Sequence, residues 1–414
     1  MNNKTKLLTL VFVLSVTVRL ATLAVFLPKL KPDVDMDSYR SLARNVAAGK
    51  GFVAVSPDGR ELPNVGRTPL YPLFLAGLMK LGGDRLGVFL AVQCVLWGII
   101  CVLTVLLSAR WLSWNAATVA GLIVALDPNC VTRGVDLRTE TLFTLLLIAG
   151  VCVLAWQRQQ PWGWFWAGLL WSLATLCRPI ATYLWIVALI LALVWRVRWI
   201  HVAVFLIGFF PLIGMWMGRN AAVTGRWFFS TNATDNLLVS WAAGVEAAQR
   251  GVSVESVQHE LAAKAGMVEF FDDRDSFADR LRNSARLSRE ILIANPGIVL
   301  RQAALGWAKL LLGPGGRTLE PSSRQPAPPA RWWLWSYSLA LGVVLVLSVI
   351  GLSKLGRSAL LPGIVLLYFV GLAGGPVSYS RYRVPITPLL AMLAVAGCTT
   401  KEQGNDLRNI HHRD

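Results

Sequence analysis

The sequence predicts an all-α polytopic membrane protein with about ten transmembrane helices and further juxtamembrane helices on its outer face. Of its 414 residues, 55% are hydrophobic and only 15% are charged, and the mean hydropathy is +0.54. Such values lie far outside those of an average soluble domain. The first apolar run, residues 8–27, follows Lys4 and Lys6 but is too long for a cleaved signal peptide and has no small-x-small cleavage site. We therefore expect a retained membrane anchor.

Apolar runs of spanning or near-spanning length recur along the chain. We interpret ten of them as membrane-spanning helices: residues 8–27, 86–111, 115–126, 141–157, 162–177, 182–195, 201–217, 332–352, 359–374 and 384–398. A further apolar run, residues 296–312, carries Arg301 and Lys309, and we assign it to the membrane interface. This choice places Lys354 on the same side as the basic N-terminus, as the positive-inside rule prefers. Both termini are then cytoplasmic.

Four parts follow from this topology. Residues 1–217 form an N-terminal transmembrane module, the candidate catalytic part, with a first outer loop at 29–85. Residues 218–331 form an extramembrane helical insert with the interfacial helix and a Pro-rich connector. Residues 332–400 form the C-terminal transmembrane helices, and residues 401–414 form a cytoplasmic tail.

The formal net charge of +17 does not indicate a nucleic-acid partner. The Lys and Arg residues are spread over short loops between apolar runs, where they face anionic membrane lipids or an anionic lipid substrate. The six cysteines lie in or beside apolar runs without CxxC spacing, so we interpret them as small buried hydrophobes. No P-loop or Rossmann glycine motif is present.

Polar residues gather at the helix ends on the predicted outer side. They are the Asp33-x-Asp35-x-Asp37 segment, the group Arg133, Asp136, Arg138 and Glu140, then Arg178, Arg219 and the segment Ser380-Arg381-Tyr382-Arg383. Arginine forks bind phosphate oxygens, and a carboxylate can accept the proton of an incoming hydroxyl. This combination predicts transfer chemistry on a phosphorylated lipid at one outer-leaflet site.

Several motifs resemble those of bacterial GT-C glycosyltransferases, the relatives of protein O-mannosyltransferases and lipid A aminoarabinose transferases. They are Asp35-x-x-x-Tyr39-x-x-Leu42-Ala43, Gly49-x-Gly51-Phe52, Arg67-x-Pro69-Leu70-Tyr71-Pro72, Arg138-Thr139-Glu140, Arg178-Pro179 and Arg381-Tyr382-Arg383-x-Pro385. The ordered series covers about residues 5 to 400. The resemblance implies inverting transfer of a sugar from a polyprenyl-phosphate donor to a cell-envelope acceptor of unknown kind. It also implies a multi-pass protein of the bacterial cytoplasmic membrane with its active site on the outer face.

The same resemblance suggests roles for individual residues. Asp35 matches the first-loop acid proposed as the catalytic base, although Asp37 remains an alternative, and Glu140 joins them as a candidate catalytic residue. The candidate ligands of the donor phosphate are Arg67, Arg178, Arg219 and Arg381, and the candidate substrate-binding residues are Tyr39, Tyr71 and Tyr382. No cofactor is certain, and a divalent cation is left open.

Each candidate also has a structural explanation. The aspartate triplet lacks the glycine and the bidentate glutamate of a calcium loop, while Asp37 could simply cap a helix that begins near Tyr39. Glu140 could favour a helix dipole, and arginines at helix ends commonly mark the headgroup boundary. Two other functions remain as alternatives, a transporter or flippase of lipid-linked sugars and an enzyme like O-antigen ligase or polymerase.

Overall fold

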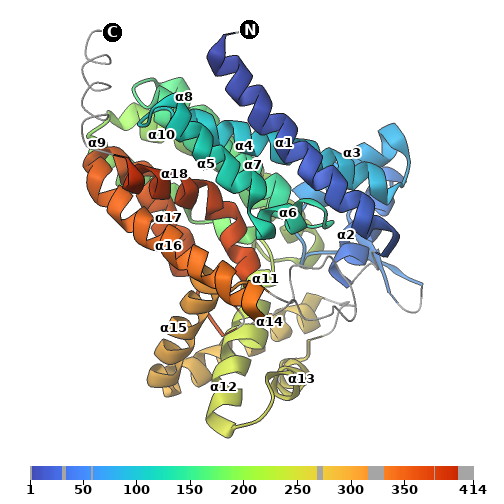
Figure 1. Cartoon of the computed structure of the whole chain (residues 1–414). Coiled ribbons are helices and arrows are strands. Elements are labelled where there is room, and N and C mark those ends of the chain that lie inside the picture. The colour runs from blue at the N-terminus through green and yellow to red at the C-terminus, as the bar shows by residue number, and fades with distance from the viewer. Residues whose placement is uncertain are drawn as a thin grey trace.

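A helical bundle with a smaller group of helices at one end makes up the protein (Figure 1). The computed structural model describes residues 2–29, 34–56, 59–267, 274–315, 331–376 and 378–399. Asp33, the Pro-rich connector and the tail at 401–414 lie outside these residues. The helical prediction is confirmed, although a small β-hairpin accompanies the helices.

A helix is present at each of the ten predicted apolar runs. These helices are α1 (Asn3–Phe26), α4 (Leu86–Ser108), α5 (Trp114–Leu126), α7 (Glu140–Gln157), α8 (Pro161–Cys177), α9 (Leu184–Trp195), α10 (Trp199–Thr224), α16 (Arg331–Leu355), α17 (Leu360–Ala373) and α18 (Thr387–Cys398). Within the described residues, five segments are long and apolar enough to cross a membrane; one of them runs through both α16 and α17. The protein is therefore a multi-pass membrane protein, while ten crossings remain a prediction.

Two helix pairs of the bundle are in backbone contact at glycines. A Cβ added at Gly168 of α8 would lie 2.4 Å from the carbonyl oxygen of Phe205 on α10. A Cβ at Gly351 of α16 would lie 1.9 Å from the carbonyl oxygen of Leu393 on α18. Small residues permit this close approach in membranes, where packing rather than hydrophobic burial drives helix association. The α8–α10 and α16–α18 pairs consequently form tightly packed parts of the bundle.

Two basic side chains of the bundle cap the C-terminal ends of neighbouring helices. The fully buried Arg19 on α1 donates to the carbonyl oxygens of Val124 and Ala125, at 3.3 and 3.1 Å, in the last turn of α5. Lys354 on α16 donates to the carbonyl oxygens of Gly397 and Thr399 at the end of α18. The last carbonyls of a helix have no partner within the helix and carry partial negative charge. Arg19 and Lys354 therefore satisfy polar backbone groups and their own charges together.

The predicted first outer loop contains α2 (Val34–Ala47), the hairpin strands β1 (Val53–Val55) and β2 (Glu61–Pro63), and α3 (Leu70–Gly82). A turn precedes the hairpin, and both Gly49 and Gly51 have positive φ, at 78° and 83°. The prediction that a helix begins near Tyr39 is wrong, since α2 begins five residues earlier, at Val34. Arg40 and Arg44 of α2 both pair with Asp84, in the turn between α3 and α4. These ion pairs anchor α2 beside the bundle.

The predicted insert is helical where it is described. It contains α11 (Asn232–Asn236), a π-helical segment η3 (Leu237–Ala242), α12 (Ala243–Arg250), α13 (Val254–Ala265), α14 (Arg274–Ala294) and α15 (Pro296–Leu312). The short α6 (Pro128–Gly134) and the 3-10 segments η1 (Leu27–Lys29), η2 (Pro179–Ala181), η4 (Gly356–Ala359) and η5 (Ser380–Ile386) lie outside it. The insert helices gather at the end of the bundle away from both termini (Figure 1). Trp241 of η3 packs on Gly375, shortly before η5.

The membrane orientation gives a first testable prediction. A reporter fused after Lys354 should be cytoplasmic, and one placed in the insert should be external, because the positive-inside rule places Lys354 with the basic N-terminus. Reporter fusions at both positions, together with labelling of cysteines introduced there from outside intact cells, show on which side of the membrane each position lies. External labelling at 354 would show that the number of crossings before it differs from the predicted one.

Candidate active site

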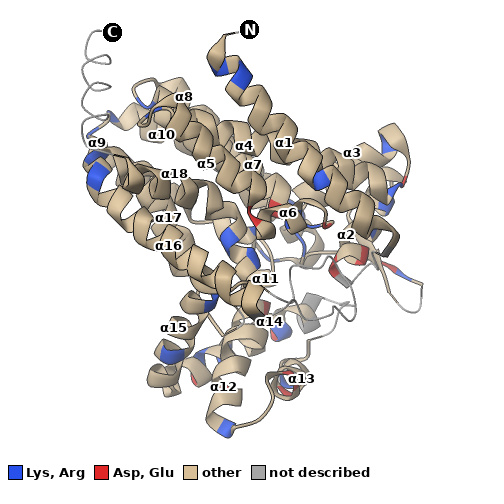
Figure 2. Cartoon of the chain, in the orientation of Figure 1, with Lys and Arg blue, Asp and Glu red and all other residues tan. Residues whose placement is uncertain are grey.

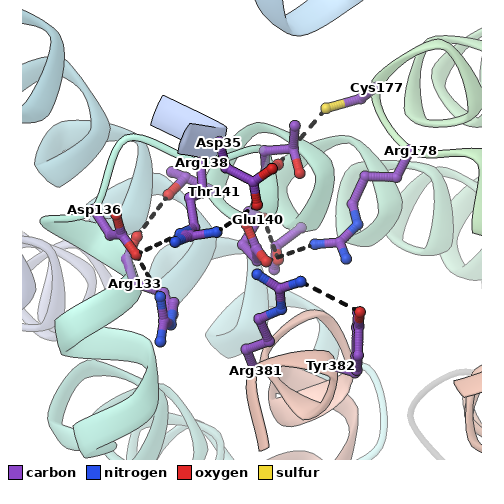
Figure 3. A network of polar contacts seen from close by, with 12 residues as sticks. Asp35, Arg133, Asp136, Arg138, Glu140, Thr141, Cys177, Arg178, Arg381 and Tyr382 are labelled. Carbon is purple, nitrogen blue, oxygen red and sulfur yellow. Dashed lines mark hydrogen bonds and ion pairs between the residues drawn. The ribbon is translucent and has the colours of Figure 1, made fainter. Parts of the chain in front are cut away.

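Charged side chains from segments far apart in the sequence meet at the end of the bundle that faces the insert (Figures 2 and 3). We call this group the charge cluster. It consists of Asp35, Arg67, Arg133, Asp136, Arg138, Glu140, Arg178 and Arg381, with Tyr39 and Tyr382 beside them. Each predicted polar segment except the one at Arg219 therefore contributes at least one described residue to the cluster, while Asp37 and Arg383 face elsewhere.

Asp35, in the first turn of α2, is held by two arginines. Its Oδ1 accepts a hydrogen bond from Arg67 Nη2 at 2.6 Å, and its Oδ2 accepts one from Arg138 Nη1 at 2.9 Å. The Asp35 side chain keeps 37% of its surface exposed. It is thus both paired and reachable from solvent.

Asp37 lies on the same turn but faces elsewhere. Residues two apart on an α-helix do not share a face, and the side chain between the two aspartates, Met36, is buried at 1% exposure. Asp37 itself is exposed. The predicted capping role for Asp37 is wrong because α2 has already begun at Val34, and between the two carboxylates the geometry favours Asp35 as the site residue.

Asp136 shares Arg138 with Asp35 and binds one further arginine, Arg133. Arg133 Nη1 and Arg138 Nε both donate to Asp136 Oδ2, the latter at 2.8 Å. The Asp136 side chain is only 1% exposed. A buried charge requires pairing, and Arg138 bridges this buried carboxylate to Asp35. The α6–α7 connection is thereby joined to the first outer loop.

Glu140 pairs with Arg178. Arg178 Nη1 lies 2.9 Å from Glu140 Oε1, and the two side chains are 14% and 3% exposed. Arg178 ends α8 because Pro179 follows it and disfavours helix in the preceding residue. The other carboxylate oxygen of Glu140, Oε2, is buried without a hydrogen-bond partner in the described part of the chain. Glu140 therefore remains one hydrogen bond short in this structure.

Arg381 differs from the other arginines of the charge cluster. Its Nη2 donates to the hydroxyl of Tyr382 at 3.3 Å, and its guanidinium lies over the Tyr382 ring. Among the described residues it forms no ion pair with a carboxylate, and its Nε is buried without a partner. Its charge is therefore the most available one for an added anion.

The balance of charge in the cluster is positive. Five arginines face three carboxylates, which leaves two positive charges in excess. A phosphodiester carries one negative charge, and a phosphate monoester carries up to two near neutral pH. The cluster is thus electrostatically matched to a phosphate group and to the additional charge that develops when such a group leaves.

The same arginines set the ionisation of Asp35. Burial acts to raise the pKa of this carboxyl, but Arg67, and then Arg138 and Arg381, outweigh burial and hold the pKa below its usual value. Burial raises the pKa of the neighbouring Tyr39 hydroxyl. At neutral pH Asp35 is therefore an ionised carboxylate beside a protonated phenol.

Besides Asp37, two predicted site residues lie elsewhere. Arg219 donates to the carbonyl oxygens of Asn64 and Phe52, at 2.8 and 2.9 Å, and so fixes the first outer loop to α10 instead of joining the cluster. Tyr71 is fully buried, and its hydroxyl donates to Gln93 at 3.0 Å. Its predicted role as a substrate-binding residue is replaced by one in packing.

Tyr39 and Tyr382 are at the cluster, as predicted. Arg67 donates to the hydroxyl of Tyr39 at 3.3 Å and lies over its ring, and Arg178 lies over the ring of Tyr382. The described residues contain no group of three or more His, Cys, Asp or Glu side chains placed to hold a metal ion.

The sequence grouped Arg133, Asp136 and Arg138 but assigned them no role. The signal was present, because three charges within six residues directly precede an apolar helix. The contact of Arg138 with Asp35 joins residues 103 positions apart, and local sequence patterns do not report such a distance.

Comparisons with known proteins concern the family and the fold. Residues 66–216 match a family model described as dolichyl-phosphate-mannose-protein mannosyltransferase. No curated protein matches the chain. Among solved structures, the archaeal oligosaccharyltransferase AglB from Archaeoglobus fulgidus, in complex with an inhibitory peptide and a dolichol-phosphate, shares the fold. It is 14% identical with a TM-score of 0.54, over 94% of this chain.

The chain spans 50% of the length of that AglB chain. A second structure, ArnT from Cupriavidus metallidurans bound to undecaprenyl phosphate, is 13% identical, with a TM-score of 0.45 over 94% of this chain and 77% of that one. The family model therefore matches one part of this multi-pass membrane protein, residues 66–216, and the likeness to the oligosaccharyltransferase shows a shared fold.

Proposed function

We propose that the protein transfers a sugar from a polyprenyl-phosphate donor to a cell-envelope acceptor, with inversion, at the outer face of the membrane. The observation that carries this proposal is the charge cluster itself. An accessible carboxylate, Asp35, stands beside an excess of positive charge from arginines. Such an arrangement fits an anionic leaving group on one side and an incoming hydroxyl on the other.

In the proposed reaction the acceptor hydroxyl attacks the anomeric carbon of the donor sugar. The new C–O bond forms as the bond from that carbon to the phosphate oxygen breaks, and the polyprenyl phosphate leaves with the bonding electrons. Asp35 accepts the hydroxyl proton. Attack opposite the leaving phosphate inverts the anomeric configuration.

The arginines have different tasks in this scheme. Arg381, which has no carboxylate partner among the described residues, binds the phosphate directly. Arg67 and Arg138 are shared between Asp35 and the phosphate. Because a phosphate that draws these two arginines away weakens their hold on the carboxylate, donor binding raises the basicity of Asp35. Arg178, fixed by Glu140, adds to the positive field that stabilises the charge developing on the phosphate.

The family name and the architecture both support a lipid-linked donor. The matching family takes its name from dolichyl-phosphate mannose, and the AglB structure contains a dolichol-phosphate. A flippase or transporter would carry its acids at the bilayer midplane, whereas Asp35 and Glu140 lie at helix N-termini. We accordingly favour an enzyme over a transporter.

The test is transfer in vitro by the purified full-length protein in lipid nanodiscs. Polyprenyl-phosphate hexoses and pentoses with a radiolabelled sugar are incubated with cell-envelope fractions. Transfer of the labelled sugar to an acceptor in the presence of the protein, and not in its absence, supports the proposal. Movement of the lipid between leaflets without any release of polyprenyl phosphate would favour a flippase instead.

The ionisation of Asp35 gives a prediction of pH dependence. Arg138→Gln removes one of the positive charges that lower the pKa of Asp35, so that pKa should rise. The acid limb of the kcat/KM profile, which reports the free enzyme, should move to higher pH. Steady-state rates across pH measure this, with Arg289→Gln on the exposed surface of α14 as the matched control. An unmoved acid limb would show that the limb does not report Asp35.

A further inference from the structure

The two arginines of η5 leave that 3-10 helix on different faces. With three residues per turn, positions two apart do not eclipse, so Arg381 faces the charge cluster while Arg383 points into the protein. Arg383 is only 1% exposed. A buried guanidinium needs several hydrogen-bond acceptors. The acceptors of Arg383 therefore show which elements are connected to η5.

Arg383 caps α15 and contacts α16. Its Nη1 donates to the carbonyl oxygens of Leu310, Leu311 and Gly313, at 2.8, 3.2 and 3.2 Å, where α15 ends. Its Nη2 donates to the hydroxyl of Tyr337 on α16 at 3.3 Å. One side chain therefore ties the C-terminus of α15, the start of α16 and η5 together.

Tyr337 extends this connection to the other side of the cluster. Its hydroxyl donates to Asp127 Oδ2 at 2.7 Å, and Asp127 Oδ1 accepts from the backbone N–H of Cys130 at 2.9 Å, which caps α6. Helix α6 carries Arg133, and the segment after it carries Asp136 and Arg138. The hydrogen bonds thus run from η5 to the half of the charge cluster contributed by α6 and α7.

We propose that Asp127, Tyr337 and Arg383 are positioning residues that hold Arg381 at a fixed distance from the carboxylates of the α6–α7 side. We call the three residues the positioning brace. This inference rests on the proposed function, since Arg381 is there the direct phosphate ligand. The C-terminal part of the chain supplies Arg381 and Tyr382 to the cluster, the N-terminal part supplies its other members, and η5 packs on both α6 and α7. The brace is the polar connection that sets their separation.

The positioning brace can be tested by removing the Tyr337 hydroxyl. Tyr337→Phe keeps the ring and its place beside the Arg383 guanidinium, 5.9 Å away, and removes only the bridging hydroxyl. Arg383 keeps its three carbonyl partners and Asp127 keeps the α6 cap, so the bundle should still assemble. The expected result is a polyprenyl monophosphate affinity about 5- to 10-fold lower in nanodiscs, the size typical of coupled neighbours.

The decisive measurement is a double-mutant cycle with Arg381→Ala. If Tyr337 acts through Arg381, Tyr337→Phe should have almost no further effect on affinity once Arg381 is gone. If Tyr337 had a merely structural role, Tyr337→Phe would weaken binding equally in the wild type and in Arg381→Ala. That additive result would overturn the proposal. Tyr183→Phe, on a half-exposed tyrosine outside the brace, is the control. Asp127→Asn keeps an acceptor oxygen, so it should lower affinity less than Tyr337→Phe.

A ligand-free measurement separates this inference from the proposed function. Spin labels at Val119→Cys and Tyr379→Cys, both exposed positions, report the distance between α5 and the segment before η5. Cys398→Ser removes the exposed native thiol, and the other cysteines are buried. Tyr337→Phe should broaden the distance distribution, and an unchanged distribution would overturn the brace. If Arg381→Ala leaves phosphate affinity intact, the phosphate role of Arg381 fails, while the distance distribution still decides on the brace.

Discussion

Asp35→Asn is expected to lower turnover about 100-fold or more, the range for loss of a general base. The asparagine keeps the shape of the side chain and one oxygen for Arg67 or Arg138, but it cannot accept a proton. Donor affinity should stay equal or increase, because the arginines lose a competing negative charge. Turnover and donor binding of the purified protein, measured together with thermal melting, check this split.

Asp37→Asn is the matched control for that result. It makes the same chemical change two residues along α2, on an exposed side chain that faces away from the charge cluster. Near-normal turnover is expected. A collapse at position 37 with normal turnover at position 35 would transfer the base to Asp37, and normal turnover in both variants would rule out a first-loop acid mechanism.

Arg381→Ala is expected to weaken donor binding by about 1.5–3 kcal/mol, the range for a charge-assisted hydrogen bond, or roughly 10- to 150-fold. Arg381→Lys should restore only part of the affinity, because a point charge lacks the planar fork. Arg381 is a cleaner test than Arg67, whose removal would also release Asp35. Equilibrium binding of the donor lipid measures the change.

Arg357→Ala provides the control for charge alone. It removes an exposed arginine in η4, in the connection that follows Lys354 at the end of α16 remote from the insert (Figure 1). The same loss of affinity at both positions would indicate general attraction of an anionic lipid to a basic protein. Unchanged affinity in Arg381→Ala would remove Arg381 from the phosphate site.

The sequence predicted the helices around the site better than the contacts between the site residues. Apolar run lengths and the prolines after Asp127 and Arg178 locate helices and their ends, because these depend on local chemistry. Which of Asp35 and Asp37 faces the protein depends on how α2 packs against the bundle, and the sequence does not show this. Pattern alone did not settle it.

Other differences have similar causes. Strands of three residues, such as β1 and β2, are too short to leave a periodic pattern. Arg219 could be placed at a helix end from sequence, but its backbone carbonyl partners lie in a loop more than 150 residues earlier. Tyr71 sits in a motif that resembles a functional one, and only the packing of α3 shows that its ring is buried.

Arg19, Lys354 and Arg383 donate hydrogen bonds to backbone carbonyl oxygens at helix ends and not to carboxylates. A peptide carbonyl does not titrate at any pH that the protein meets, whereas Asp35 and Glu140 do. Only acid strong enough to reach the lowered pKa of Asp35 can therefore discharge this partner of the cluster arginines, and the carbonyl contacts of Arg19, Lys354 and Arg383 are unchanged there. Loss of activity on acidification should in consequence be reversible, since the groups that switch off are not the ones that hold the helices together.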